Sequence, residues 1–370
     1  GGTGNDSLYF GANLTGADQA DGGDGRDVVV LQGNYVITLG AGILTNSESM
    51  SLQSGSRTVF GDTAGNTYTY NITTVNANVL PGQTMIFNGQ SLQVGEDFTF
   101  DGSAETDGKL LVYGGLGVDT FKGGANGDTF FFEGNRWGDG DSVDGGGGRD
   151  ALIISSGSGI NHFEFGETAL TSIEAISVNN RFTTDPSQKP SYELVLSNGN
   201  VAAGATLILN GASLVDPSQT VSFDGSAVHD GNLIMLGGGG NDSLTGGSGA
   251  DQLFAGLGQD SLTGGAGADL FQFRSVADST TADPDLILDF QHGVDKIDLN
   301  VIDADPATAG NQAFSFSNDG TFHHAVGELR AFDTGLGYWN VEGDINGDGT
   351  ADFSIFVKTN APLVVSDFVL

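Results

Sequence analysis

The 370-residue sequence contains no cysteine, only 7 prolines and only 12 lysine and arginine residues. The lack of cysteine excludes disulfides and thiolate metal sites. The 12 basic residues face 47 acidic ones, and the resulting formal net charge of −35 argues against nucleic acid or an anionic membrane as a partner. No apolar run approaches the roughly 18 residues that a membrane-spanning helix needs, so we expect no transmembrane segment.

Glycine is abundant instead, with 61 residues of 370, about twice the usual share. A disordered acidic chain is one interpretation of this composition. However, 38% of the residues are hydrophobic and 24 are phenylalanine, which is too much for permanent disorder. We therefore expect an ordered protein that binds several cations, and disorder of its repeat segments only when those cations are absent.

Residues 237–272 form four contiguous nine-residue units, GGGGNDSLT, GGSGADQLF, AGLGQDSLT and GGAGADLFQ. Each unit carries aspartate at its sixth position and a large apolar residue at its eighth. Glycine supplies the positions that need a positive φ or a close backbone approach. The last three residues predict a short strand whose middle side chain points inward.

The turn GGxGxD offers carbonyl and carboxylate oxygens, which are the hard ligands that calcium prefers. One apolar residue per unit returns much less free energy than the ordering of nine residues costs. Aspartates stacked in successive turns also repel one another. A divalent cation converts that repulsion into ligation, so we predict that calcium holds the turns together.

The repeat resembles the calcium-binding nonapeptide of the RTX (repeats-in-toxin) proteins. The resemblance implies a parallel β-roll in which a turn shares its ions with the turn two units along. Gly238, Gly240 and Asp242 would then share a site with Ala255, Leu257 and Asp260. Likewise, Gly247, Gly249 and Asp251 would share one with Gly264, Ala266 and Asp269. The remaining candidate ligands in these turns are Gly237, Gly239, Gly246 and Ser248.

Similar turns occur outside this run, intact or degenerate. Their position-six aspartates are Asp6, Asp18, Asp27, Asp119, Asp128, Asp141 and Asp150, and Asp289 is a further candidate ligand. Eleven such aspartates are visible in all, which suggests on the order of ten bound calcium ions.

A longer repeat underlies the nonapeptides. DGGDGRDVVVL at 21–31 returns as DGGGGRDALII at 144–154, and FDGSAETDG at 100–108 returns as FDGSAVHDG at 223–231, in both cases 123 residues later. Each copy holds roll turns around an insert of alternating apolar and polar residues with turn signals. We expect each insert to form a small antiparallel β-sandwich.

The sequence therefore predicts an all-β chain with six segments. These are roll turns at 1–31, a first insert at 32–111, roll turns at 112–153, a second insert at 154–234, the roll at 235–272 and a C-terminal capping module at 273–370. Within that module, PDLILDFQHGVDKIDL (284–299) is expected to close the open end of the roll.

The C-terminal module resembles that of the serralysin metalloproteases and related type I-secreted proteins. The similar residues are DLILDF, DKIDL, GELRAFDTGLGYWNVEGDINGDGTADFSIFV (327–357) and the terminal SDFVL. The resemblance implies a C-terminal secretion signal, the type I secretion machinery as a partner, and a protein secreted by a Gram-negative bacterium. The chain also begins directly with a nonapeptide, GGTGNDSLY at 1–9, and we therefore expect it to be a fragment of a longer protein.

DINGDGTAD (344–352) resembles the first half of an EF-hand loop, with Asp344, Asn346 and Asp348 at ligand positions. Position twelve is Ile355, where a bidentate glutamate is required, which rules out a complete EF-hand. A calcium-bound turn and a simple Gly/Asp turn remain equally good interpretations.

We expect no catalytic residue in this chain. The five histidines, at 162, 229, 292, 323 and 324, show no H-E-x-x-H spacing, and no G-x-S-x-G or phosphate-binding motif occurs. The leading hypothesis is a non-catalytic calcium-binding region that folds outside the cell after type I secretion and serves as an extracellular scaffold. Two alternatives are an adhesin or surface-layer segment whose inserts bind polysaccharide or neighbouring protomers, and the tail of an extracellular hydrolase.

Overall fold

The computed structural model describes residues 1–180 and 187–370, and this part consists of β-strands and three short 3-10 turns without an α-helix. The chain divides into two compact units, Gly1–Gly157 with Phe165–Thr184, and Ser158–Glu164 with Asp185–Leu370. Among the described residues, no helix is long and apolar enough to cross a membrane. The β-roll predicted from the sequence is confirmed in both units.

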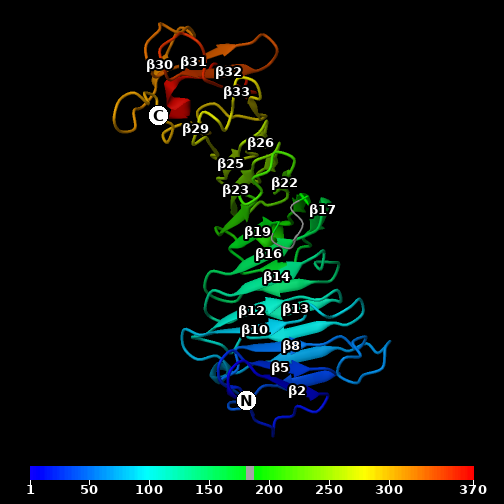
Figure 1. Cartoon of the computed structure of the whole chain (residues 1–370). Coiled ribbons are helices and arrows are strands. Elements are labelled where there is room, and N and C mark those ends of the chain that lie inside the picture. Colours follow the sequence, from blue (N-terminus) through cyan, green and yellow to red (C-terminus); the bar gives the residue numbers. More distant parts are fainter. Residues whose placement is uncertain (181–186) are drawn as a thin grey trace. The chain divides into compact units, whose positions relative to one another are not determined.

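The first unit contains two parallel ladders of strands. One ladder is, in spatial order, β2 (Ser7–Gly11), β5 (Val28–Leu31), β8 (Ser49–Leu52), β10 (Thr84–Asn88), β12 (Lys109–Tyr113), β14 (Thr129–Glu133), β16 (Ala151–Ser155) and β19 (Ala175–Asn179). The other is β6 (Tyr35–Thr38), β9 (Tyr70–Thr73), β11 (Phe98–Asp101), β13 (Asp119–Lys122), β15 (Ser142–Asp144) and β18 (Leu170–Thr171). The labelled strands of the first ladder lie above one another in chain order (Figure 1).

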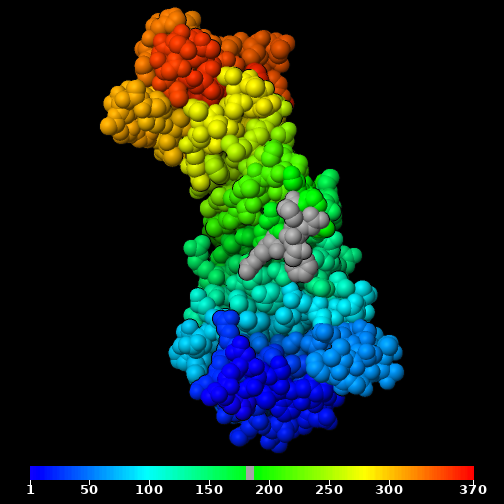
Figure 2. Space-filling model, in the orientation of Figure 1, coloured from blue at the N-terminus to red at the C-terminus, as the bar shows by residue number. Residues whose placement is uncertain are grey.

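Small elements complete this unit. The strand pairs β1 (Gly2–Thr3) with β4 (Gly23–Asp24) and β3 (Ala20–Asp21) with β7 (Leu44–Thr45) lie near its start, and a 3-10 turn, η1, spans Asn76–Asn78. The longest connection, residues 53–69 between β8 and β9, forms a lobe on the surface (Figure 2). Phe60 in this lobe stacks on Tyr9 with a centroid distance of 4.5 Å.

The core of the first unit lies between its two ladders. Alternate residues of each strand point inward, so Phe87 of β10 meets Phe100 of β11 at 4.4 Å between ring centroids. Phe98 contacts Phe121 at 5.1 Å, one coil further on. All four rings are buried. Stacked phenylalanines therefore supply an apolar core, which the nine-residue units alone provide sparsely.

The second unit has the same design. One ladder is β21 (Thr206–Asn210), β23 (Asn232–Gly238), β25 (Gln252–Gly256), β27 (Leu270–Gln272), β29 (Lys296–Asp298) and β34 (Phe368–Val369). The other is β17 (Gly159–Glu164), β20 (Pro190–Val195), β22 (Val221–Asp224), β24 (Ser243–Thr245), β26 (Ser261–Thr263), β28 (Asp285–Ile287), β33 (Phe353–Val357), β32 (Trp339–Asp344), β31 (Glu328–Asp333) and β30 (Ser315–Ser317). Two 3-10 turns, η2 (Asn198–Asn200) and η3 (Val365–Asp367), complete it.

The prediction of antiparallel sandwiches for residues 32–111 and 154–234 is wrong. In the first segment β8 pairs in parallel with β5, and β11 with β13, so the segment continues the roll. In the second, leaving aside residues 181–186, which lie outside the described part, β22 pairs in parallel with β24. Alternation of apolar and polar residues shows that one face of a strand is buried, but it does not fix the direction of pairing. Each turn carries the chain to the opposite ladder instead of closing a hairpin.

The C-terminal module also differs from expectation. Residues 284–299 do not close the roll, because β28 and β29 add one more parallel coil to it. β33 then covers β28 and β34 covers β29. Antiparallel pairing begins only here, between β33, β32 and β31. The end of the roll is therefore covered by residues after 327, which removes the exposed strand edge.

Candidate metal sites in the turns

The position-six aspartates lie directly before strands and fold back over their own turns. In the second unit, the Gly238 N–H donates to Asp242 Oδ2 at 2.6 Å, and the Gly247 N–H donates to Asp251 Oδ2 at 2.7 Å. In the first unit, the Gly124 N–H donates to Asp128 Oδ2 at 2.6 Å. Each carboxylate thus faces the glycines that open its own turn, as the GGxGxD pattern requires.

The second oxygen of each carboxylate connects successive coils. The Asp242 N–H donates to Asp260 Oδ1 at 2.7 Å, and the Asp251 N–H donates to Asp269 Oδ1 at 2.9 Å. The same contact recurs in the first unit. The donor N–H and acceptor side chain there are Asp6 and Asp27, Asp119 and Asp141, and Asp128 and Asp150. We call these stacked carboxylates the aspartate ladders.

Several oxygens of the ladders are buried without any hydrogen-bond partner. They are Asp27 Oδ2, Asp119 Oδ1, Asp150 Oδ2, Asp260 Oδ2, Asp269 Oδ2 and Asp285 Oδ2. A buried carboxylate oxygen without a partner is costly unless a cation or a proton neutralises it. These orphaned oxygens show that the donor set fits a hard divalent cation such as calcium.

The glycine that opens a turn leaves room beside the carboxylate of the position-six aspartate. A Cβ on Gly114 would lie 2.7 Å from Asp119 Oδ2, and one on Gly123 would lie 2.6 Å from Asp128 Oδ2. A Cβ on Gly246 would overlap both Asp251 Oδ2 and the carbonyl oxygen of Gly264 in the next coil. A side chain here would fill the place where carboxylate and carbonyl oxygens converge.

Burial and mutual repulsion raise the pKa values of the ladder aspartates. Desolvation is the main cause throughout. It raises the pKa of Asp285 to about 9, with the charge of Asp260 as the next cause, and it raises that of Asp260 to about 8. The pKa values of Asp242 and Asp269 rise to about 7. In the first unit, the pKa of Asp119 rises to about 8. Without a cation, the fold thus favours protonated carboxyl groups.

The turns that the sequence predicted to share ions are adjacent in the structure. The Leu257 N–H donates to the Gly238 carbonyl at 3.0 Å, and the Ala266 N–H donates to the Gly247 carbonyl at 2.9 Å. Gly237 lies against Ala255, and the Cβ of a side chain on Gly258 would overlap the carbonyl of Gly240. Leu257 is 48% exposed, and it contacts the neighbouring turn through its backbone N–H. Gly239, Ser248, Gly249 and Gly264 lie in the same stacked turns.

Three other groups of predicted ligands have different surroundings. Asp18 caps its own turn, where its Oδ2 accepts the Thr15 N–H at 2.7 Å. Asp289 binds the last nonapeptide turn, because its two oxygens accept the N–H groups of Gly264 and Gly265 at 2.9 and 2.8 Å. Asp141, in a degenerate turn, nevertheless joins the ladder through Asp119.

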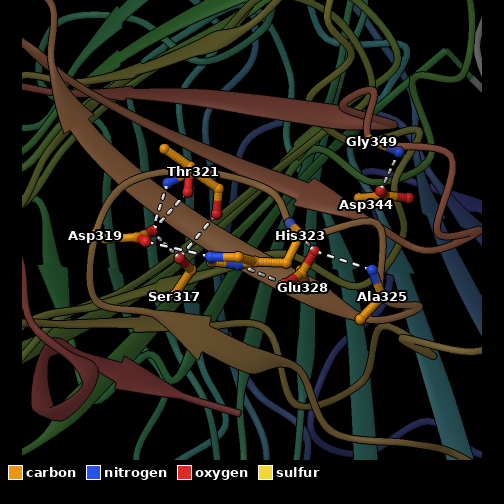
Figure 3. Close-up of polar contacts among 8 residues, drawn as sticks. All are labelled: Ser317, Asp319, Thr321, His323, Ala325, Glu328, Asp344 and Gly349. Carbon is orange, nitrogen blue, oxygen red and sulfur yellow. Dashed lines mark hydrogen bonds and ion pairs between the residues drawn. The ribbon is translucent and has the colours of Figure 1, made fainter.

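The loop at 344–352 is closed by its own backbone. Asp344 is fully buried, and its Oδ2 accepts the Gly349 N–H at 2.7 Å (Figure 3). Its Oδ1 accepts the Gly347 N–H, also at 2.7 Å. Asn346 Oδ1 accepts the Asp348 N–H at 2.9 Å. Asp352, at position nine, accepts the Ile345 N–H at 2.8 Å. These hydrogen bonds stabilise the turn.

Sequence reasoning missed the carboxylates that end the ladders. Glu48 Oε2 accepts the Asp27 N–H at 2.7 Å, and Glu174 Oε2 accepts the Asp150 N–H at 2.6 Å. In the second unit, Asp285 and Asp295 accept the N–H groups of Asp260 and Asp269 at 2.8 and 3.0 Å. The sequence did contain a signal for these two glutamates. The matching segments ILTNSESMSL (43–52) and ALTSIEAISV (169–178) of the two copies align Glu48 with Glu174.

One histidine is held between two carboxylates. His323 Nδ1 lies 3.1 Å from Glu328 Oε1, and Nε2 lies 3.2 Å from Asp319 Oδ2 (Figure 3). The hydrogen bond to Glu328 and the charge of Asp319 raise the pKa of His323.

In residues 1–180 and 187–370, no three His, Cys, Asp or Glu side chains form a metal-binding group. Any cation in the turns must therefore use backbone carbonyls as well as aspartates, which is the ligand set that the nonapeptide predicts.

Two family models match parts of this chain. Residues 220–370 match the serralysin C-terminal domain of the M10 peptidases. Residues 14–33 and 111–134 match the RTX calcium-binding nonapeptide repeat. Nonapeptide repeats of this family bind calcium, and together the two matches support a calcium-binding region of a secreted protein.

A metalloprotease, AprA from Pseudomonas entomophila (strain L48), is 36% identical over 100 residues. The match covers 27% of this chain and 20% of that protein. The chain thus spans about a fifth of the length of this relative. The parts of the chain that the family models match are non-catalytic.

Proposed function

We propose that this chain is a non-catalytic region that calcium folds outside the cell, where it serves as a scaffold. The observation that carries this proposal is the set of buried ladder oxygens without a hydrogen-bond partner. Three of them, Asp27 Oδ2, Asp150 Oδ2 and Asp269 Oδ2, lie beside the glycines that open their turns, Gly22, Gly145 and Gly264. At low calcium the repulsion within the ladders opposes folding, and at high calcium the same carboxylates become ligands.

The proposed ions lie between a turn and the turn two units along. One site uses the carbonyls of Gly238, Gly240, Ala255 and Leu257 with Asp242 and Asp260. The next uses Gly247, Gly249, Gly264 and Ala266 with Asp251 and Asp269. We extend the set to Asp285 and Asp295, which continue these two ladders. With the ladders of the first unit, the total remains on the order of ten calcium ions.

Export through a type I channel of a Gram-negative bacterium follows from the serralysin-like module. In the folded state Phe368–Val369 forms β34, and Asp367 is fully buried with its oxygens bound to the Val364 N–H and to His292. A secretion machinery can read this segment only while it is unfolded. Calcium-dependent folding therefore keeps the segment accessible inside the cell and orders it outside.

A second candidate is that the chain is part of an extracellular hydrolase whose catalytic domain lies elsewhere in a longer protein. The similarity to metalloprotease AprA favours this interpretation. The sequence of the surrounding gene tests it, because an adjoining H-E-x-x-H domain would support it and a gene without any enzyme domain would contradict it. The polysaccharide-binding alternative rests on the duplication of the inserts, since two copies would give avidity. The inserts supply strands of the roll and form no separate sandwiches among the described residues.

Circular dichroism during a calcium titration tests the proposed function. We expect the metal-free chain at neutral pH to lose most of the circular dichroism signal that comes from the stacked coils. Added calcium should restore this signal cooperatively. Magnesium at the same concentration is the control, because it demands near-octahedral geometry and dehydrates reluctantly. A fully folded spectrum in excess chelator would contradict the proposal.

A further inference from the structure

A buried glutamate in the first duplicated segment has no counterpart in the second. Glu105 is fully buried, and neither of its carboxylate oxygens has a hydrogen-bond partner. Glu105 is the fourth residue of the turn GSAETD at 102–107. The Ala125 N–H donates to the Glu105 carbonyl at 2.8 Å, so this turn stacks on the turn of Asp128.

Two further oxygens near this turn are also buried without a partner. They are Asp107 Oδ1, two residues along the same turn, and Thr74 Oγ1, just after β9. Thr74 belongs to the adjacent coil, because its N–H donates to the Asp101 carbonyl at 2.9 Å, immediately before the turn. Desolvation raises the pKa of Glu105 to about 7, with the charge of Asp107 as the next cause.

In the second copy of the sequence, the positions equivalent to Glu105 and Thr74 belong to an ordinary apolar core. The equivalent of Glu105 is Val228, which is fully buried. The equivalent of Thr74 is the buried Leu196, whose N–H donates to the Asp224 carbonyl at 2.9 Å in the same way.

The surroundings of the third residue, Asp107, also differ between the two copies. The equivalent of Asp107 is Asp230, which is exposed and accepts a hydrogen bond from Asn198 Nδ2 at 2.8 Å. All three oxygen-bearing side chains of the first copy are thus replaced or turned to solvent in the second. The backbone is the same in both copies, since Asn76 and Asn198 accept the N–H groups of Thr106 and His229 at 2.6 and 2.7 Å.

We propose that Glu105, Asp107 and Thr74 form an additional calcium site, present in the first duplicated segment only. The three side chains offer carboxylate and hydroxyl oxygens, which are hard ligands, and no nitrogen or sulfur ligand. A buried carboxylate persists in a core when a cation neutralises it. None of the three residues lies in a nonapeptide, and their turn stacks on the nonapeptide turn of Asp128.

Native mass spectrometry of the full chain in calcium tests this site, because it resolves individual bound ions. Glu105→Gln keeps the size of the side chain and removes its charge, and the double variant T74L/E105V copies the core of the second segment. We expect each to bind one calcium ion fewer than the wild-type chain. Glu164→Val, at an exposed glutamate, is the matched control and should leave the count unchanged.

Melting in chelator provides the second measurement and distinguishes this proposal from the proposed function. T74L/E105V should melt at a higher temperature than the wild-type chain without calcium, because it removes an uncompensated buried charge. An unchanged ion count in both variants would overturn the additional site and leave Glu105 as a protonated core residue. A wild-type chain that binds no calcium at all would instead overturn the function proposed for the whole roll.

Discussion

At the scale of single residues, the ladder aspartates combine two properties that conflict without a cation. Their side chains are buried, with Asp260 and Asp285 fully enclosed, and they are stacked on one another through backbone N–H groups. Hydrogen bonding satisfies part of each carboxylate but leaves one oxygen of several without a partner. The ladder thus sets the geometry of the turn, and the metal neutralises its charge.

Asp260→Asn should raise the calcium concentration at the midpoint of folding about tenfold or more. The asparagine can still accept the Asp242 N–H, but it removes one charged ligand, and interactions of charged groups contribute roughly 1.5–3 kcal/mol each. Asp230→Asn, at an exposed aspartate outside the ladders, is the control. Calcium titrations followed by circular dichroism compare the two, and equal midpoints for both variants would contradict a ligand role for Asp260.

The raised pKa values predict how pH acts on the metal-free chain. Asp242, Asp260 and Asp285 have folded pKa values of about 7, 8 and 9 against an ordinary value of 3.8, so the folded state binds more protons between these limits. Their contribution to stability is complete below pH 4 and is lost as the pH rises through 7 to 9. The metal-free fold should therefore be more stable at pH 5 than at pH 8.

Calcium binding should show the opposite dependence on pH, because calcium displaces those protons. We expect tighter calcium binding at pH 8 than at pH 6, with proton release on binding at pH 7. Calorimetry in two buffers of different ionisation enthalpy measures that release. A binding enthalpy that is independent of the buffer would contradict the coupling.

At the scale of elements, the turn and the strand of each coil depend on different parts of the sequence. Gly246 opens a turn where an added Cβ would overlap Asp251 Oδ2 and the Gly264 carbonyl, whereas Leu253 of the following strand is a fully buried core residue. The fixed spacing of glycine, aspartate and apolar residue was therefore sufficient to predict the coil, its turn and most aspartates of the ladders.

The pairing direction in the duplicated segments was not predictable in the same way. YTYNITTV and its neighbours alternate as any half-buried strand does, and the turns between them lack the GGxGxD pattern. The ladder ends Glu48 and Glu174 were missed because glutamate replaces aspartate there and follows no glycine turn. Both features depend on contacts between residues more than 20 positions apart, which local sequence does not encode.

Gly246→Ala should destabilise the calcium-bound chain by about 1–3 kcal/mol, since the added methyl group forces either the carboxylate or the next coil to move. Gly16→Ala is the matched control, because no atom lies within 4 Å of a Cβ at Gly16. Thermal melting in saturating calcium compares the variants. Equal melting temperatures for both would show that the turn tolerates a side chain where we place the ion.

At the scale of the whole molecule, stability has two sources that are unevenly distributed along the chain. The first duplicated segment buries phenylalanines 87, 98 and 100, and the second buries phenylalanines 163, 165 and 223. The nonapeptides at 237–272 bury about one apolar residue per unit, such as Leu244, Leu253 and Leu262. The formal net charge of −35 opposes compaction everywhere without cations.

Hydrogen exchange in chelator should reveal this difference. We expect the amides of β10, β11 and β12 to retain more protection than those of β24, β25 and β26, because aromatic packing supports the former and calcium the latter. In saturating calcium both groups should be protected. Equal and complete loss of protection in both groups on chelation would contradict an apolar contribution from the duplicated segments.

The central claim is that calcium ions lie between stacked turns and neutralise the aspartate ladders. A crystal structure grown in calcium, with anomalous scattering measured to locate the ions, tests it most directly. The account predicts anomalous peaks beside Asp242 and Asp260 and beside Asp251 and Asp269, each surrounded by carbonyls of two successive turns. Ordered turns with no peak between them, or with these carboxylates directed away from one another, would contradict it.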